Sequence, residues 1–233
     1  MNVIPQAAKD GFVRGVAPLA RALIRRGVSP NALTTVGALV VFTAAVAFGV
    51  GQARWAGFLL LVSGLFDILD GQVARQGDRR TTFGAFYDST LDRMGEAAVF
   101  GGIALFFLRD GVPVEREAIA VGLAIVALSA SLLVSYTRAR AEGLGLDCRV
   151  GIAARAERLL LLGGPPLFFG AGPEGALLFW IVAVLAGVTL ITVVQRVWHV
   201  ARTTAGGGGG AEGRTPRPRD TLPGHTPALR KGL

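Results

Sequence analysis

The segment WAGFLLLVSGLFDILDGQVARQGDRRTTFGAFYDSTLD, from Trp55 to Asp92, decides the fold of this chain. Its first part is an apolar run as long as a membrane-spanning helix, which needs roughly 20 residues at a rise of about 1.5 Å per residue. The segment also places aspartates in and just after apolar helix-like sequence, where water is scarce and an acid is costly. It therefore indicates a membrane protein with a polar function inside its helices.

The composition of the whole chain agrees with a membrane location. Of the 233 residues, 52% are hydrophobic and 17% are charged, whereas soluble domains carry about 25% charged residues. The mean hydropathy is +0.52. The single cysteine, Cys148, excludes an internal disulfide. The net charge of +8 does not indicate a nucleic-acid partner, because the basic residues gather at the ends of apolar segments.

Six apolar segments are long enough to cross or nearly cross a bilayer. We therefore predict an all-α integral membrane protein with six transmembrane helices and an amphipathic juxtamembrane helix over about residues 8–27. The membrane domain comprises residues 1–204. The Gly- and Pro-rich basic tail, residues 205–233, buries too little apolar surface to offset its ordering entropy, and we expect it to be disordered. The predicted spans are residues 31–52, 55–75, 83–108, 117–140, 157–171 and 176–200.

The distribution of Lys and Arg predicts the orientation in the membrane. When the loops are placed alternately on two sides, twenty basic residues fall on the side of both termini. Only Arg54, Arg109 and Arg116 fall on the other side. By the positive-inside rule, both termini are cytoplasmic in a multi-pass protein of the plasma membrane.

The aspartates lie on single faces of two predicted helices. At 3.6 residues per turn, offsets of 0, +3, +4, +7 and +8 share a face, and so do offsets of 0, +4 and +8. If the two helices are antiparallel neighbours, their carboxylates converge near the cytoplasmic boundary. The first face comprises Asp67, Asp70, Gly71, Ala74 and Arg75, and the second comprises Gly84, Asp88 and Asp92.

Four acids at such a boundary require cations. Each buried acid costs about 2.5–3.5 kcal/mol, so four approach the whole stability of a domain, about 5–15 kcal/mol. Carboxylate oxygens are the ligands that Mg²⁺ and Mn²⁺ prefer, and four suit the two-metal sites of phosphoryl transfer. The small residues leave room for a partner helix or a diphosphate, and Arg75 adds a bidentate phosphate donor. A cation- or proton-coupled transporter with the same acids is the alternative of another class.

The other basic residues fall into two groups: residues explained by membrane topology or by a structural ion pair, and residues that form a candidate anion site. We interpret Arg79 and Arg80 as positive-inside residues, and Arg93 as the partner of Glu96 in an ion pair. Positive-inside placement alone would also supply the arginines near the ends of the last three spans. The candidate pocket for a phosphorylated acceptor comprises Arg138, Arg155, Arg158 and Arg196.

The pattern D-x2-D-G-x2-A-R-x8-G-x3-D-x3-D is met at every fixed position from Asp67 to Asp92, and SPNALTTVG precedes the first span. In these motifs the chain resembles the CDP-alcohol phosphotransferases, integral membrane enzymes of phospholipid synthesis. The resemblance implies a homodimer of six-span subunits, with two divalent cations in a cavity open to the cytoplasm. It implies Asp67, Asp70, Asp88 and Asp92 at the metal site, Asp92 as general base, and Gly71, Ala74, Arg75 and Gly84 beside the CDP moiety.

The resemblance also implies a reaction. The acceptor hydroxyl, deprotonated by Asp92, attacks the β-phosphorus of CDP-diacylglycerol, and CMP leaves. The stretches FGAFYDSTLDRMGEAAVFGG, SYTRARAEGLGL and RAER are most similar to the bacterial phosphatidylinositol phosphate synthases, whose acceptor is inositol phosphate. Arg138 stands where those synthases often carry Lys, and Ala156 replaces a Pro. Transfer to glycerol 3-phosphate, which gives phosphatidylglycerol phosphate, is the alternative within the family.

Overall fold

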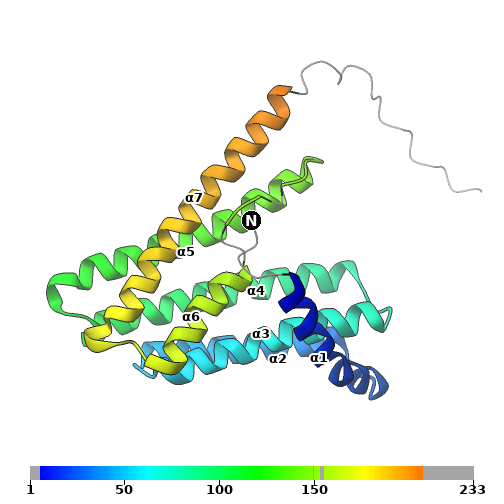
Figure 1. Cartoon of the computed structure of the whole chain (residues 1–233), viewed down its shortest axis with the longest axis horizontal. Coiled ribbons are helices and arrows are strands. Elements are labelled where there is room, and N and C mark those ends of the chain that lie inside the picture. Colours follow the sequence, from blue (N-terminus) through cyan, green and yellow to red (C-terminus); the bar gives the residue numbers. More distant parts are fainter. Residues whose placement is uncertain (1–5, 149, 153–154, 207–233) are drawn as a thin grey trace, which may run out of the picture.

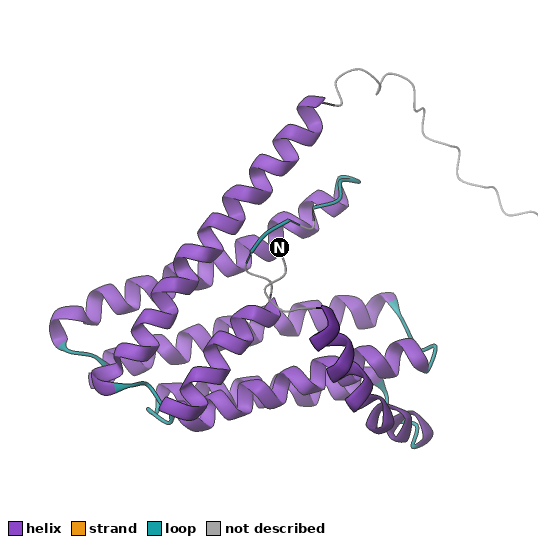
Figure 2. Cartoon of the chain, in the orientation of Figure 1, coloured by secondary structure: helices purple, strands orange, loops and turns teal. Residues whose placement is uncertain are grey.

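A computed structural model of the chain describes residues 6–148, 150–152 and 155–206. Within these residues the fold consists of helices joined by short loops, without a strand (Figures 1 and 2). A π-helical turn, η1 (Phe107–Gly111), follows the fourth long helix, and a 3-10 turn, η2 (Pro173–Gly175), precedes the last. The long helices are α1 (Gln6–Arg25), α2 (Pro30–Gly49), α3 (Ala53–Gln76), α4 (Thr82–Phe106), α5 (Val114–Gly143), α6 (Arg155–Phe169) and α7 (Ala176–Gly206).

The predicted all-α fold is confirmed, and the six predicted apolar segments coincide in order with α2 to α7. Four helical segments of the described residues are long and apolar enough to span a membrane. α4 carries four charged residues between Asp88 and Glu96, and α6 has only 15 residues. α7 ends at Gly206, and the rest of the predicted tail lies outside the described residues. The four spans are Pro30–Gly49, Ala53–Gln76, Val114–Gly143 and Pro173–Ala205.

Local sequence signals fix the first turns of α2 and α4. α2 begins after Ser29, whose hydroxyl accepts a hydrogen bond from the Ala32 N–H at 3.1 Å, and Pro30 fills the first helical position. α4 begins after Thr81, whose hydroxyl accepts from the Gly84 N–H at 2.9 Å. These caps hold the two helix starts that border the acidic part of α3.

Two glycines let helices pack backbone against backbone. A Cβ atom on Gly102 of α4 would lie 2.0 Å from the Ala45 carbonyl oxygen of α2. A Cβ atom on Gly57 of α3 would lie 2.5 Å from the Gly163 carbonyl oxygen of α6. Glycine is therefore required at both crossings. The largest buried side chains of the surrounding core are Phe48, Phe100, Ile103 and Phe107.

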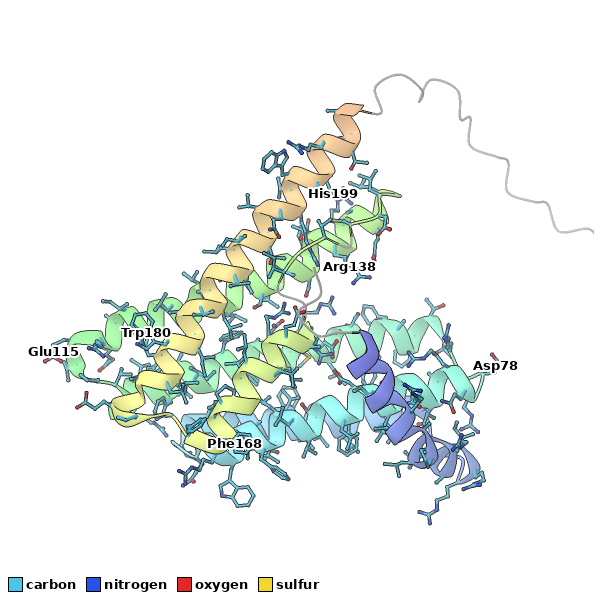
Figure 3. All side chains as sticks on the ribbon, viewed as in Figure 1. Asp78, Glu115, Arg138, Phe168, Trp180 and His199 are labelled. Carbon is cyan, nitrogen blue, oxygen red and sulfur yellow. The ribbon has the colours of Figure 1, made fainter. Side chains whose placement is uncertain are left out.

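α5 and α7 pack along each other, and their later halves diverge from α4 and α6 (Figure 1). The α3–α4 loop, the α5–α6 loop and the end of α7 lie toward the right and top of this view, and the α4–α5 and α6–α7 connections lie toward the left. Figure 3 shows the same two ends of the molecule: Asp78 marks the end with the α3–α4 loop, and Glu115 marks the end with the α4–α5 connection. The loops that the basic residues predict to be cytoplasmic therefore share one end of the molecule.

α1 lies across α3 and has two chemically different faces. Ala20 is fully buried against Leu69 and Val73 of α3. Arg21 and Arg25 lie on the exposed side. The helix that was predicted over about residues 8–27 spans Gln6–Arg25, and its placement at a membrane surface stays a prediction.

Candidate active site

An arginine from the start of α6 joins the acidic faces of α3 and α4. Nη1 of Arg155 donates to Oδ2 of Asp67 at 2.7 Å and to Oδ2 of Asp92 at 2.6 Å. Asp67 belongs to α3 and Asp92 to α4. One cationic nitrogen therefore lies between two carboxylates that are 25 positions apart in the sequence.

α2 contacts both acidic helices through two adjacent hydroxyls. Oγ1 of Thr34 donates to Oδ2 of Asp70 at 2.7 Å, and this hydrogen bond is buried. Oγ1 of Thr35 lies 3.0 Å from the hydroxyl of Tyr87 on α4. A buried hydrogen bond to a charged acceptor is strong and directional. Thr34 therefore orients the Asp70 carboxylate.

A cavity of about 190 Å³ lies between the start of α2 and the acidic faces of α3 and α4. We call it the α2–α4 cavity. Its walls include two glycines close to polar side chains: a Cβ atom on Gly71 would lie 3.2 Å from Nη1 of Arg75, and one on Gly84 would lie 3.0 Å from Oγ1 of Thr81 and 3.1 Å from Oδ1 of Asn31. The cavity is lined by the first turns of α2 and α4 and by the end of α3, through Pro30, Asn31, Thr34, Asp70, Gly71, Ala74, Arg79, Arg80, Thr81, Gly84, Ala85 and Asp88.

A second cavity, of about 450 Å³, opens where α5 and α7 diverge from α4 and α6 (Figure 1). We call it the arginine cavity. Asp88 lines both cavities, so both border the acidic face of α4. The charged residues that line the arginine cavity are Asp88, Asp92, Glu96 and Glu142 together with Arg93, Arg138, Arg155, Arg158 and Arg196.

The four predicted acceptor arginines all line this cavity, but they differ in what they bind. Nε of Arg138 binds Oε1 of Glu142 at 2.9 Å, one turn along α5, and both side chains are about half exposed. Nε of Arg196 donates to the Val150 carbonyl at 2.9 Å, and its Nη1 donates to the Val134 carbonyl. Two of the five guanidinium N–H groups of Arg196 are thus engaged by neutral carbonyls, which leaves its positive charge to attract an anion.

The sequence predicted an ion pair between Arg93 and Glu96, and this prediction is wrong. Oε1 of Glu96 instead accepts from Nε of Arg158 at 2.8 Å, and both side chains are largely buried. Nη1 of Arg93 donates to the Ser89 carbonyl of its own helix. Arg158 lies 62 residues from Glu96, so a pattern search within one helix could not find this partner.

The donor chemistry fits a divalent cation. The four aspartates offer only carboxylate oxygens, as hard cations require. In the described part of the chain, no three acidic, His or Cys side chains lie close enough together to hold an ion in their present orientations. Arg155 engages Asp67 and Asp92, and Thr34 engages Asp70. Asp67 and Asp92 bring carboxylate oxygens of two helices to one cationic nitrogen, and this oxygen donor set fits a divalent cation in place of that nitrogen.

Several residues of the α2–α4 cavity were not among the predicted site residues. Asn31 and Thr34 belong to the stretch SPNALTTVG, which contributes to the family resemblance but contains none of the predicted site residues. Arg79 and Arg80 were interpreted as topology residues, yet both line the cavity. Nη1 of Arg79 also donates to the Val28 carbonyl at 3.2 Å, which ties the α3–α4 loop to the start of α2.

The family model of the CDP-alcohol phosphatidyltransferases matches residues 27–194. The chain belongs to this family. The match contains every lining residue of the α2–α4 cavity and all the predicted metal, CDP-lipid and general-base residues, and of the residues that line the arginine cavity it omits only Arg196. The predicted enzyme class is thereby confirmed.

Relatives in this family carry a more specific name. The chain is 37% identical to a phosphatidylinositol phosphate synthase of Streptomyces avermitilis over 85% of this chain and 82% of that protein. It is 39% identical to the synthase of Cutibacterium acnes over 83% of this chain and 96% of that protein. These relatives support the predicted likeness to phosphatidylinositol phosphate synthases.

A solved relative has the same fold. The phosphatidylinositol phosphate synthase of Mycobacterium tuberculosis with CDP-DAG bound superimposes with a TM-score of 0.69 at 33% identity, over 79% of this chain and 92% of that one. A second structure of that protein, in complex with manganese and citrate, gives the same TM-score and identity over 79% of this chain and 88% of that one.

Proposed function

We propose that this chain transfers a phosphatidyl group from CDP-diacylglycerol to inositol phosphate, and so forms phosphatidylinositol phosphate and CMP. The observation that carries the proposal is that two cavities with different lining residues share Asp88 in their walls. The α2–α4 cavity has the small-residue walls that a diphosphate needs, and the arginine cavity has the charge that a phosphorylated alcohol needs.

The donor binds in the α2–α4 cavity. Gly71, Ala74 and Gly84 let the diphosphate approach the helix backbones, and Arg75 lies over Gly71, where its guanidinium can bind a phosphate oxygen. Asn31 adds an amide at the same wall. The acyl chains extend into the surrounding lipid, because the walls belong to membrane helices.

The acceptor binds in the arginine cavity. Arg138, Arg155, Arg158 and Arg196 line it, and a phosphate monoester pairs best with arginine forks. Arg196 and Arg138 face the phosphate most directly, since Arg158 is buried against Glu96, whereas the pair of Arg138 with Glu142 is about half exposed and Arg196 binds only neutral carbonyls in the described contacts. Arg155 joins them when it leaves Asp67 and Asp92.

Asp92 accepts the proton of the attacking hydroxyl. It lines the arginine cavity and lies one turn after Asp88 on α4, so an acceptor held there presents its hydroxyl toward the α2–α4 cavity. The new bond joins this oxygen to the β-phosphorus, and the bond from that phosphorus to the CMP oxygen breaks with its electron pair on CMP. Two divalent cations, Mg²⁺ or Mn²⁺, held by Asp67, Asp70, Asp88 and Asp92, supply positive charge for the diphosphate and the leaving CMP.

The membrane placement follows the same proposal. α4 and α6 cross the bilayer with the four apolar spans, because both pack among them and their polar faces turn toward the cavities. α1 lies in the cytoplasmic surface of the plasma membrane, where its basic face meets anionic lipid. The site opens to the cytoplasm, both termini are cytoplasmic, and the enzyme acts as a homodimer.

The acceptor is tested by CMP release from the purified enzyme with CDP-diacylglycerol and Mg²⁺. We expect release with inositol phosphate and little with glycerol 3-phosphate. Preference for glycerol 3-phosphate would make the enzyme a phosphatidylglycerol phosphate synthase instead. No release with either acceptor, together with cation or proton flux in proteoliposomes, would support the transporter alternative.

A further inference from the structure

The loop between α5 and α6 is attached to one face of α7 by three successive side chains. Nε2 of His199 lies 3.2 Å from the Asp147 carbonyl oxygen, and because a carbonyl only accepts, this nitrogen carries the hydrogen. Nε of Arg196 donates to the Val150 carbonyl at 2.9 Å. Oγ1 of Thr192 accepts a longer bond, 3.4 Å, from the Ile152 N–H.

The three α7 residues follow a helical repeat. Thr192, Arg196 and His199 are separated by four and three positions, so they form one row along α7. The carbonyl or N–H groups that they bind run along the loop in the reverse order, from Asp147 to Ile152. The loop backbone therefore lies antiparallel to this row of side chains.

Gly151 shows that the loop lies against α7 at van der Waals distance. Its φ is +136°, a region that L side chains rarely adopt, and a Cβ atom there would lie 2.5 Å from Cγ2 of Thr192. Thr192 itself is fully buried. At this point the loop and the helix are in direct contact, and the Ile152 hydrogen bond to Thr192 lies beside that contact.

The loop also touches one wall of the arginine cavity. The Val150 carbonyl accepts a hydrogen bond from Nε of Arg196, and Arg196 lines the cavity. Arg138 and His199 lie toward the same end of α5 and α7 in Figure 3. A shift of the loop away from α7 would therefore release the orientation of the Arg196 guanidinium.

We infer that Thr192 and His199 are positioning residues for the acceptor site, acting through the α5–α6 loop. They hold the backbone groups of Asp147 and Ile152 against α7, on either side of Val150, and this fixes the orientation in which Arg196 meets a phosphate monoester. The inference rests on the proposed function only in the identity of the acceptor. The attachment of the loop to α7 is a separate, directly measurable property.

The sharpest variant is Thr192→Val, which keeps the shape of the side chain and removes the hydroxyl. Its matched control is Thr189→Val, because Thr189 is equally buried and its hydroxyl donates to the Leu185 carbonyl of its own helix at 2.6 Å. Thr192→Val also removes the donation of this hydroxyl to the Val188 carbonyl at 2.8 Å, which the control matches within its own helix, so the two variants differ by the bond to Ile152. Loss of one hydrogen bond corresponds to a change of about two- to tenfold in an equilibrium. We expect Thr192→Val to raise the KM for inositol phosphate by about that factor, with kcat and the KM for CDP-diacylglycerol unchanged.

Hydrogen exchange gives a readout that does not depend on the acceptor. The Ile152 amide should exchange about two- to tenfold faster in Thr192→Val than in Thr189→Val or the unmodified enzyme. His199→Phe should accelerate exchange across residues 146–152 in the same way. If the enzyme used another phosphorylated alcohol, the proposed acceptor would fail, while faster exchange with a raised KM for that alcohol would support the inference.

A glycine variant tests the same contact by steric means. Gly151→Ala should raise the acceptor KM more than Thr192→Val does, because it adds both backbone strain and a clash with Thr192. Gly143→Ala is the control at the start of this loop, since a Cβ there meets nothing within 4 Å. The inference is overturned if Thr192→Val and His199→Phe match the Thr189→Val control in exchange and in acceptor KM.

Discussion

The buried ion pair between Glu96 of α4 and Arg158 of α6 should contribute more to stability than any exposed pair near the site. Its atoms are 2.8 Å apart, and the side chains are only 14% and 4% exposed. Removing one partner of a buried pair costs about 3–5 kcal/mol, because the remaining charge stays buried. For a chain of this size 1 kcal/mol shifts Tm by about 2–4 °C, so Glu96→Ala should lower Tm by about 6–20 °C.

The matched control is the ion pair between Arg138 and Glu142, which lines the same cavity. These atoms are 2.9 Å apart, but the side chains are 49% and 50% exposed, and an exposed i,i+4 pair is worth about 0.3–0.5 kcal/mol. Glu142→Ala should therefore lower Tm by no more than about 2 °C. Thermal unfolding in detergent, followed by size-exclusion chromatography of the heated protein, compares the two variants directly.

The double variant Glu96→Gln with Arg158→Gln distinguishes a charge effect from a loss of packing. Both side chains are then neutral and can bond to each other, so this variant should be more stable than Glu96→Ala. Equal melting of Glu96→Ala and Glu142→Ala would refute the reasoning. The reasoning would also be refuted if Arg158→Gln left Tm unchanged and raised only the KM for the acceptor. Arg158 would then bind the ligand rather than hold α4 and α6 together.

Three further predictions concern the chemistry and the helix crossing. Asp92→Asn should lower CMP release by a factor of about 10²–10⁴, with CDP-lipid binding and Tm retained, and near-normal turnover would contradict its role as base. Excess chelator should abolish CMP release, and Mg²⁺ or Mn²⁺ but not K⁺ should restore it, while activity that survives dialysis against chelator would exclude the metal site. Gly102→Ala should destabilise the protein by about 1–3 kcal/mol, because its Cβ would lie 2.0 Å from the Ala45 carbonyl oxygen. Gly101→Ala, whose Cβ meets nothing within 4 Å, should melt no lower than the unmodified protein.

The sequence predicted those features that depend on local periodicity. The six apolar segments became α2 to α7, and the two acidic faces of α3 and α4 border the cavities, because helix period and chain order determine both. The partners of the charges could not be predicted in this way. Glu96 has Arg93 within its own helix, yet it binds Arg158, because the packing of α4 against α6 decides which guanidinium lies in the buried space.

The path of the α5–α6 loop could not be predicted from the sequence either. Thr192, Arg196 and His199 lie on one face of α7, but their partners are backbone groups of the loop, and backbone groups carry no sequence signal. The one local signal was Gly151, whose positive φ and close contact with Thr192 require glycine. In the sequence alone, that glycine cannot be distinguished from an ordinary turn residue.

α6, with 15 residues, is the shortest of the described α-helices, and its first turn carries two arginines that bind acids of the site. Arg155 and Arg158 lie on one face, three positions apart, and they bind acids of α3 and α4. The two contacts differ in accessibility, since Arg158 is buried with Glu96 while Arg155 is about one-third exposed. Arg158 can therefore hold α6 in place while Arg155 changes partner from carboxylate to phosphate. Such a division allows a cationic side chain to move within the site without loosening the helix that carries it.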